Sequence, residues 1–422
     1  MSLTKTRERP TISPASHTVR GAAPALPPRI GRRAVFYLPG FDPREPETYW
    51  GLFRREARLT AERRGLAIAV GEPRRAEDGI SLDWPVTAGS TRTAYSLLRW
   101  DAIVRARFPR PEWRRLAAVP ALLLRLSRTG YTRSLRKEAR RFSTVIYGVH
   151  RIYLAFALLS LVLAGSALAL IPAEARPWAW PAVPVLAYAV LALLIRLTRG
   201  KPLYVAHLVD DTAFTHDHAA GRTPEMPARL DAFAARIAAA EAEGGIDEIV
   251  VVGHSSSSFL GVEVLDRILA RDPGFGARVP VSFVTLGSVI PWIGLDPAAA
   301  RIRGALARVA AAEQIAWLDI RAPWDWLSIH LRDPLTASGV PSPGPDRPAV
   351  MRVQIEDLIE PRTVARRRWN LFRMHFQLLM SSRKPEAFDY IAFVAGPEPV
   401  RAAIDRCRRM PARAAPDTAR VA

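Results

Sequence analysis

The twelve residues Asp247–Ser258, Asp-Glu-Ile-Val-Val-Val-Gly-His-Ser-Ser-Ser-Ser, decide the fold of this 422-residue chain. Their β-branched run predicts a short buried strand, and the following residues, Phe259–Leu269, predict a helix. Between the two, Gly253-His-Ser255 predicts a tight turn. A strand, a Gly-x-Ser turn and a helix in this order form a nucleophile elbow, which exposes a serine at the top of a parallel sheet.

The rest of the chain alternates between predicted strands and helices. Amphipathic or polar helices are expected over residues 45–64 and 228–243. Further strands are expected over Ala34–Leu38, Leu66–Val70, Val279–Leu286, Ile315–Ile320 and Val350–Ile355. This alternation predicts an α/β fold with a mostly parallel sheet.

A serine hydroxyl needs a base to activate it and an acid to orient that base. Among four consecutive serines, Ser255 has the correct spacing from the preceding glycine. α/β-hydrolases use the chain order serine, acid, histidine. That order selects Asp325, just past one predicted strand, and His375, which follows the last. The weaker alternatives for the acid are Asp319 and Asp333.

Backbone N–H groups are expected to hold the oxyanion. In this fold one donor comes from a loop after an early strand and the other from the residue after the nucleophile. The loop Leu38-Pro-Gly-Phe-Asp-Pro-Arg44 offers Gly40 or Phe41, and Ser256 offers the second donor. The alternative is a simple Pro-Gly turn in which Asp42 caps the next helix. Asp325 could likewise be only a turn or helix-cap residue, and His375 only a packed side chain.

Two apolar stretches, residues 152–171 and 177–195, contain no charged residue. Each is long enough for a helix across a hydrocarbon core of about 30 Å. Because only five residues separate them, we expect a transmembrane hairpin inserted into the α/β domain. Basic residues outside both ends predict that the flanks are cytoplasmic. The alternative is a helical hairpin buried in a soluble core, and prolines weaken the second span.

The formal charge of +20 suggests an anionic neighbour. The single cysteine, Cys407, excludes an intrachain disulfide framework and fits a reducing compartment. The chain is therefore expected to be a multi-pass protein of the cytoplasmic (inner) membrane, with its catalytic domain on the cytoplasmic side. We divide it into a disordered N-terminal segment (1–30), the first part of the α/β domain (31–110), a basic amphipathic membrane-proximal segment (111–150), the hairpin (151–198), the second part of the domain (199–400) and a flexible basic tail (401–422). For residues 111–141, an exposed helix that covers the domain is the alternative to a membrane-surface helix.

The run Val281-Ser-Phe-Val-Thr-Leu-Gly-Ser288, followed by Trp317-Leu-Asp-Ile and Ala322-Pro-Trp-Asp325, resembles the strand and turn pattern of class 3 lipase-like α/β-hydrolases. The Pro-Gly-Phe-Asp-Pro-Arg loop is similar to that of bacterial membrane-associated hydrolase-like proteins. These resemblances cover residues 34–64 and 228–380. They imply a serine hydrolase in which Ser255, Asp325 and His375 match the triad. Ser257 stands where the family has its second glycine.

Other patterns suggest weaker hypotheses. A cluster of histidines and aspartates lies between His207 and His218, but it lacks a recognisable metal-ligand spacing, so a polar surface loop or helix is favoured and no metal is expected. Asp210 and Asp211 could instead lie near the rim of the active site. The basic run Arg362–Arg368 is expected to face solvent or lipid. No nucleic-acid motif, phosphate loop or dinucleotide fingerprint occurs, so neither nucleic acid nor a cofactor is expected.

These features predict a membrane-anchored esterase- or lipase-like enzyme. Its expected partners are membrane lipids and a hydrophobic ester substrate; protein partners are not indicated. One alternative is an inactive protein that uses the hydrolase fold as a binding or scaffold module. Another is an acyltransferase that uses the same residues and passes the acyl group to an alcohol.

Overall fold

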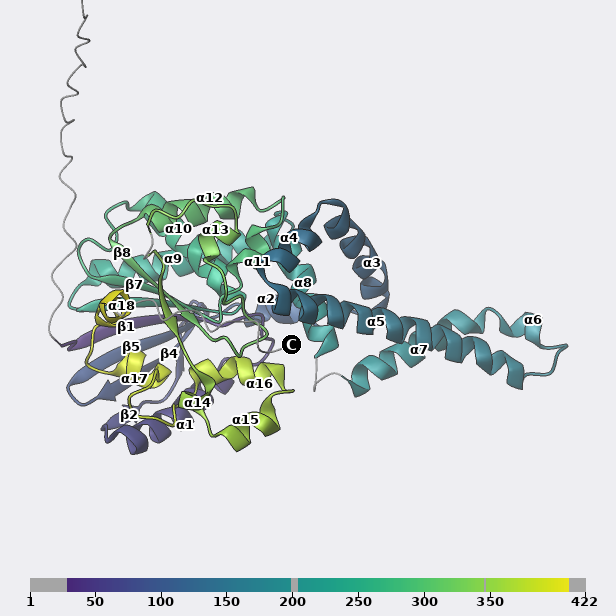
Figure 1. Ribbon diagram of the computed structural model, residues 1–422, viewed down its shortest axis with the longest axis horizontal. Coiled ribbons are helices and arrows are strands. Elements are labelled where there is room, and N and C mark those ends of the chain that lie inside the picture. Colours follow the sequence, from purple (N-terminus) through teal and green to yellow (C-terminus); the bar gives the residue numbers. More distant parts are fainter. Residues whose placement is uncertain (1–28, 199–203, 345–346, 410–422) are drawn as a thin grey trace, which may run out of the picture.

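The computed structural model describes residues 29–198, 204–344 and 347–409 (Figure 1). The expected disorder before residue 29 and the part of the expected tail after residue 409 lie outside these residues. The expectation that the tail begins at residue 401 is wrong, because Val400–Arg409 form the helix α18. Val400, Ala403 and Ile404 are buried there, so apolar packing holds this segment on the domain.

Within the described residues, nine strands form one sheet in the order β2-β4-β5-β1-β6-β7-β8-β9, and β3 pairs with β4. The strands are β1 (Arg32–Leu38), β2 (Ile68–Val70), β3 (Arg74–Arg75), β4 (Ser81–Ala88), β5 (Thr91–Leu98), β6 (Glu248–His254), β7 (Val281–Leu286), β8 (Ile315–Arg321) and β9 (Ala349–Arg352). Parallel pairing runs from β5 through β1, β6, β7 and β8 to β9. β4 pairs antiparallel with β2, β3 and β5. The predicted α/β architecture with a mostly parallel sheet is confirmed.

The hairpin of β4 and β5 is absent from the sequence-based expectations. Leu82, Trp84 and Val86 are buried, while the residues between them are more exposed. This alternation is the pattern of a strand with one buried face. The turn that follows contains Gly89 at a φ of +60°, where glycine is the favoured residue. The signal was therefore present in the sequence.

Helices cover both faces of the sheet (Figure 1). Along β1, Ala34, Phe36 and Leu38 belong to one buried cluster, and Val35 and Tyr37 belong to the other. The first cluster includes residues of α9 (Glu225–Glu243), α10 (Ser257–Arg271), α11 (Ile290–Gly294), α12 (Ala300–Ala311) and α13 (Pro334–Ala337). The second includes residues of α1 (Glu47–Arg64), α14 (Ile355–Leu358), α17 (Tyr390–Ala395) and α18. Because both faces are covered, the strands are nearly continuous apolar runs.

A group of helices lies between β5 and β6 in the sequence and packs at one end of the sheet. They are α2 (Asp101–Arg107), α3 (Glu112–Arg128), α4 (Tyr131–Glu138), α5 (Arg140–Ala167), α6 (Arg176–Ala179), α7 (Ala182–Leu197) and α8 (Val205–Ala219). α3 packs against α4, α7 and α8, and its Val119 and Leu126 are buried. One face of the helix therefore packs on the domain, while Trp113, Leu116 and Leu124 are exposed, and a membrane-surface position stays a prediction.

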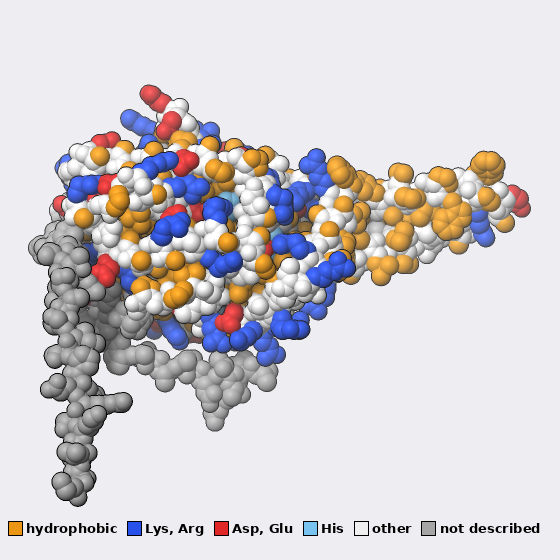
Figure 2. Space-filling view, turned by 90° about the horizontal axis from the view of Figure 1, so that it is seen from above, with side chains coloured by type: hydrophobic (Ala, Val, Ile, Leu, Met, Phe, Trp, Pro, Cys, Tyr) orange, Lys and Arg blue, Asp and Glu red, His pale blue; other side chains and the backbone are white. Residues whose placement is uncertain are grey.

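α5 and α7 lie side by side and project away from the sheet as an arm (Figure 1). The arm is covered with exposed apolar side chains: Leu158, Leu159, Leu161, Val162, Leu163, Leu170, Trp178, Trp180, Val185, Leu186, Tyr188, Leu193 and Leu197. Figure 2 shows this hydrophobic arm against a body rich in basic side chains. Within the described residues one helix, Arg140–Leu170, is long and apolar enough to cross a membrane, and only 17% of its most apolar stretch is buried.

The second expected span is shorter than expected. α7 begins at Ala182 and has 16 residues, whereas the expected span began at residue 177. Such a helix is about 24 Å long, less than the roughly 30 Å of a hydrocarbon core. Pro177 and Pro181 lie before α7, and a proline in a helix interior is unfavourable because it removes a backbone hydrogen bond. The described residues thus show two packed helices, of which one meets the length of a span, and the transmembrane hairpin stays a prediction.

Candidate functional site

The site lies at the carboxyl ends of β1 and β6, which are neighbours in the sheet. After β1 the chain continues to strands on the β5 side of the sheet, and after β6 it continues to β7 on the opposite side. In open α/β sheets, such a reversal of strand order opens a crevice beyond the strand ends, where ligands bind. The loop after β1 and the turn after β6 therefore meet at the position where this fold offers a site.

Ser255 lies in the turn between β6 and α10 and has a φ of +56°. This left-handed conformation costs a non-glycine residue roughly 1–2 kcal/mol. The turn is held by two backbone hydrogen bonds: Ser255 N donates to Leu286 O at 3.0 Å, and Ser258 N donates to Ser255 O at 2.9 Å. Gly253 is required, because a Cβ there would lie 2.6 Å from Ser257 O. The predicted elbow is present, with the strain that exposes its serine.

Ser257, which replaces the expected second glycine, is fully buried. Its hydroxyl donates a hydrogen bond to the carbonyl oxygen of Pro39, in the loop after β1. Trp100 Nε1 donates to the same oxygen at 2.8 Å. The serine side chain therefore fits the elbow and ties it to the neighbouring loop, so this departure does not disrupt the turn.

Gly40 lies directly against the elbow. A Cβ at Gly40 would be 2.9 Å from Ser255 Cβ and 3.4 Å from Ser255 Oγ. Phe41, the next residue, is buried and packs its ring against Trp100 and Phe214. The structure thus brings the predicted oxyanion loop to the predicted nucleophile.

Asp42 does not cap α1, contrary to the alternative considered for this loop. The N-cap of α1 is Pro46. Asp42 instead accepts hydrogen bonds from Arg44 Nε at 2.8 Å and from the Tyr49 hydroxyl at 2.7 Å. These contacts fold the loop onto itself and place the Arg44 guanidinium over the Phe376 ring, 4.7 Å from its centroid.

Asp325 and His375, 50 residues apart in the sequence, form a buried hydrogen bond. The Oδ2 atom of Asp325 lies 2.7 Å from Nδ1 of His375. Asp325 Oδ1 accepts a second hydrogen bond from the backbone of Leu327 at 3.0 Å. With a proton on Nδ1, the neutral imidazole has an unprotonated Nε2. That Nε2 atom is buried and has no hydrogen-bond partner among the described residues.

Ser255 and the Asp325–His375 pair both lie beside the end of β7. Leu286 O accepts the hydrogen bond from Ser255, and a Cβ on the next residue, Gly287, would lie 2.8 Å from His375 Cε1. The described residues include no hydrogen bond between Ser255 and His375. In proteins without bound substrate, catalytic hydrogen bonds are often long and tighten only in the complex.

His254, which the sequence analysis did not select, stacks on His375. The ring centroids are 4.7 Å apart and the rings are inclined by 17°. Its Nδ1 lies 3.0 Å from the Tyr37 hydroxyl. Burial, together with nearby His375 and Arg44, lowers the pKa of His254 well below its usual value. A neutral His254 supports the His375 ring without competing for protons.

The cluster between His207 and His218 is helical, as one of the two expected alternatives proposed, but most of it is buried and not on the surface. It forms α8, of which Asp210, Asp211, His216 and His218 are buried. Each side chain has a different partner: Asp210 pairs with Arg115 at 2.7 Å, His216 with Asp296 at 2.6 Å, and His218 with Thr223 at 2.7 Å. In the part of the chain that the structure describes, no group of potential ligands could hold a metal.

Asp211 lies beside the elbow, as the hypothesis of a position near the site suggested. The Ser256 hydroxyl is 3.2 Å from both carboxyl oxygens of Asp211. Burial is the main cause that raises the pKa of Asp211 to about 8, and the neighbouring charge of Asp210 adds to it. Asp211 is therefore mostly protonated at neutral pH and can donate as well as accept a hydrogen bond.

Asp319 and Asp333, the alternatives to Asp325 as the acid, have hydrogen-bond partners other than His375. Asp319 accepts from Thr285 Oγ1 at 2.6 Å and from Arg321 Nε at 2.7 Å. Asp333 caps α13 by accepting from the backbone of Leu335 and Thr336. Neither has a hydrogen bond to His375 in the described residues.

Comparisons of the chain with family models, with curated proteins and with solved structures found no match. The functional reading of the site therefore rests on its own geometry.

Proposed function

We propose that this protein is a serine hydrolase of the α/β-hydrolase type that cleaves a hydrophobic or lipid ester. The observation that carries the proposal is the strained Ser255 next to a buried Asp325–His375 pair at one end of a parallel sheet. Asp325 holds Nδ1 of His375, and Nε2 has no hydrogen-bond partner among the described residues, as is also true of one ring nitrogen in His150, His216, His254 and His330. A free Nε2 beside a strained serine turn fits a base that waits for a proton.

In the proposed mechanism, His375 Nε2 takes the proton of Ser255 Oγ while that oxygen bonds to the ester carbonyl carbon. The carbonyl oxygen becomes an oxyanion, which the backbone N–H groups near Gly40 and Ser256 stabilise. The carbon–oxygen bond to the alcohol then breaks, and the leaving alcohol takes the proton from His375. Water attacks the acyl-enzyme in the same way and releases the acid. Asp325 stays ionised and stabilises the imidazolium.

The arm supports membrane attachment as part of the proposal. Its exposed apolar side chains form a surface far more continuous than soluble proteins usually expose. Exposed basic residues lie near the ends of the arm helices that adjoin the body: Arg133, Arg136, Lys137, Arg140, Arg141, Arg151 and Arg196. Under the positive-inside rule, the body is cytoplasmic and the arm enters the inner membrane. A site at the bilayer surface favours an ester with long apolar chains.

The test is labelling of the detergent-solubilised full chain with a fluorophosphonate, which reacts with activated serines. Wild type and Ser257→Ala should label, whereas Ser255→Ala and His375→Ala should not. The matched control Ser127→Ala changes an exposed serine on α3 and should label as wild type does. A folded wild type that does not label would contradict the proposal and favour a binding role for the fold. If labelling succeeds, product analysis with and without an acceptor alcohol separates hydrolysis from acyl transfer.

A further inference from the structure

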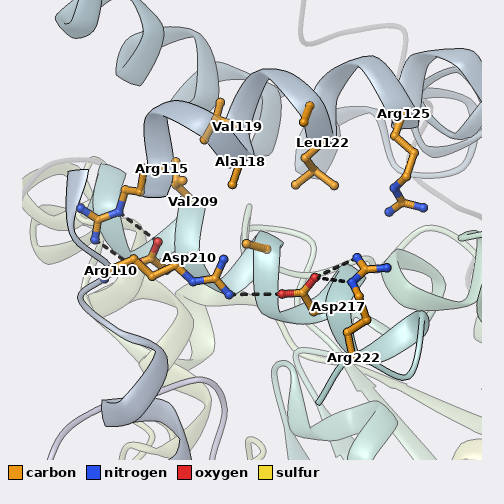
Figure 3. Close-up of a pocket in the computed structure, with 12 residues that line it drawn as sticks. Arg110, Arg115, Ala118, Val119, Leu122, Arg125, Val209, Asp210, Asp217 and Arg222 are labelled. Carbon is orange, nitrogen blue, oxygen red and sulfur yellow. Dashed lines mark hydrogen bonds and ion pairs between the residues drawn. The ribbon is translucent and has the colours of Figure 1, made fainter. Parts of the chain in front are cut away.

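A cavity of about 230 Å³ lies between α3 and α8, and its lining includes no residue of the elbow or of the Asp325–His375 pair. Figure 3 shows α3 on one side, with Ala118 and Leu122 turned towards the cavity, and α8 on the other. Most of the lining surface is apolar. Small side chains such as Ala118, Ala121 and Ala213 leave the space open.

Arginines surround this apolar floor. Arg110, Arg115, Arg125 and Arg222 all contribute to the lining, against two carboxylates, Asp210 and Asp217. Arg115 is the most deeply buried of the four, and its hydrogen bonds go to Asp210 and Glu112. Arg125 donates to both carboxyl oxygens of the buried Asp296, at 3.3 and 3.0 Å. Arg110 and Arg222 are therefore the lining arginines that a ligand can recruit.

One carboxylate serves two of these arginines. Asp217 accepts from Arg222 at 2.8 Å and from Arg110 at 3.3 Å, as the dashed lines in Figure 3 mark. It also lies 3.8 Å from Arg107, whose closer partner is Glu225. Positive charge therefore exceeds negative charge at this end of the cavity. A guanidinium pair of this kind binds phosphate or carboxylate oxygens through several charge-assisted hydrogen bonds.

A mostly apolar lining with guanidinium groups beside it fits a molecule that has an anionic head group and an apolar chain. Pockets that enclose drug-sized ligands measure about 300–1,000 Å³, so this smaller cavity suits a head group with its first carbons. The cavity also lies at the base of the arm, because α3 packs against α7 and α8 packs against α5. If the arm enters a bilayer, the cavity lies near the depth of the lipid head groups.

We propose that the cavity between α3 and α8 binds the phosphate head group of an anionic membrane lipid. This inference rests on the membrane attachment proposed above, but it needs no reaction at Ser255. Arg110 and Arg222 share a single carboxylate, Asp217, and the bound phosphate supplies further negative charge to them. The first carbons of the acyl chains cover the alanine side chains that line the cavity. The lipid then holds α3 and α8 together at the base of the arm.

The experiment is native mass spectrometry of the full chain in detergent, titrated separately with dioctanoyl phosphatidate, dioctanoyl phosphatidylcholine and inorganic phosphate. The wild type should bind phosphatidate at a concentration at least about tenfold lower than the other two. Arg110→Gln combined with Arg222→Gln should remove this preference. Ala118→Leu should weaken binding by filling the cavity without a change of charge. The control Arg58→Gln changes an exposed arginine on α1 and should bind as wild type does.

Unchanged phosphatidate binding in the cavity variants would overturn the inference, as would equal binding of phosphatidylcholine. Binding of inorganic phosphate as tight as that of phosphatidate would overturn the assignment to a lipid. Fluorophosphonate labelling of the same samples keeps the two proposals apart. Selective lipid binding without labelling contradicts only the hydrolase, and labelling without selective lipid binding contradicts only the head-group site.

Discussion

The substitution Asp211→Asn should change how the stability of the protein depends on pH. Asp211 is buried on α8, and burial raises its pKa from 3.8 to about 8. The folded state therefore holds a proton on this carboxyl over a pH range in which the unfolded chain has released it. Asparagine has nearly the same shape, can still accept the hydrogen bond of Ser256 and does not titrate.

The magnitude follows from linkage. A group whose pKa is higher in the folded state stabilises that state fully below the unfolded pKa, and the contribution is lost as pH rises towards the folded pKa. Each pH unit between the two values changes the free energy of unfolding by about 1.4 kcal/mol. From about pH 5 to about pH 7, the wild type should therefore lose about 3 kcal/mol relative to Asp211→Asn.

The assay is urea unfolding in detergent, followed by tryptophan fluorescence at several pH values for both proteins. The difference between the two profiles isolates the single group, because all other titrations are shared. The control Asp78→Asn changes an exposed carboxylate and should leave the profile parallel to that of the wild type. Parallel profiles of wild type and Asp211→Asn would refute the reasoning, because they would mean that Asp211 is ionised in the folded state.

Two further predictions concern the elbow and the histidine. Ser255→Gly should raise the free energy of unfolding by about 1 kcal/mol, because glycine adopts the φ of +56° without strain, and it should abolish labelling; a loss of stability in urea unfolding would contradict the strain argument. Gly287→Ala should slow fluorophosphonate labelling at least about tenfold, because its Cβ would lie 2.8 Å from His375 Cε1. Gly89→Ala is the matched control, since Gly89 has a similar φ of +60° and no atom near the added Cβ. If Gly89→Ala labels as slowly as Gly287→Ala, backbone strain alone explains the effect and the contact with His375 does not.

The sequence by itself determined those helices, strands and turns whose conformation depends only on residues close in the chain. The β-branched run before Gly253 was sufficient to predict β6, the turn and α10, because strand propensity, a glycine and helical periodicity all act within a few residues. The uncharged run within α5 likewise predicted a long apolar helix, and the structure shows it as part of an exposed arm. Chain order selected Asp325 and His375, and their hydrogen bond of 2.7 Å is compatible with that selection.

Only the tertiary structure decided which polar groups meet. The sequence suggested a position near the site for Asp211 but gave no sign of its burial, and it did not select His254. Both have shifted pKa values because α8 and β6 bury them against the elbow. Burial is a property of the packed fold, so no local pattern reveals it. The same applies to the arginine-lined cavity, whose residues come from the loop before α3, α3 itself, α8 and the turn after α8. Sequence determines which groups are present, whereas long-range packing determines their partners and their distance from water.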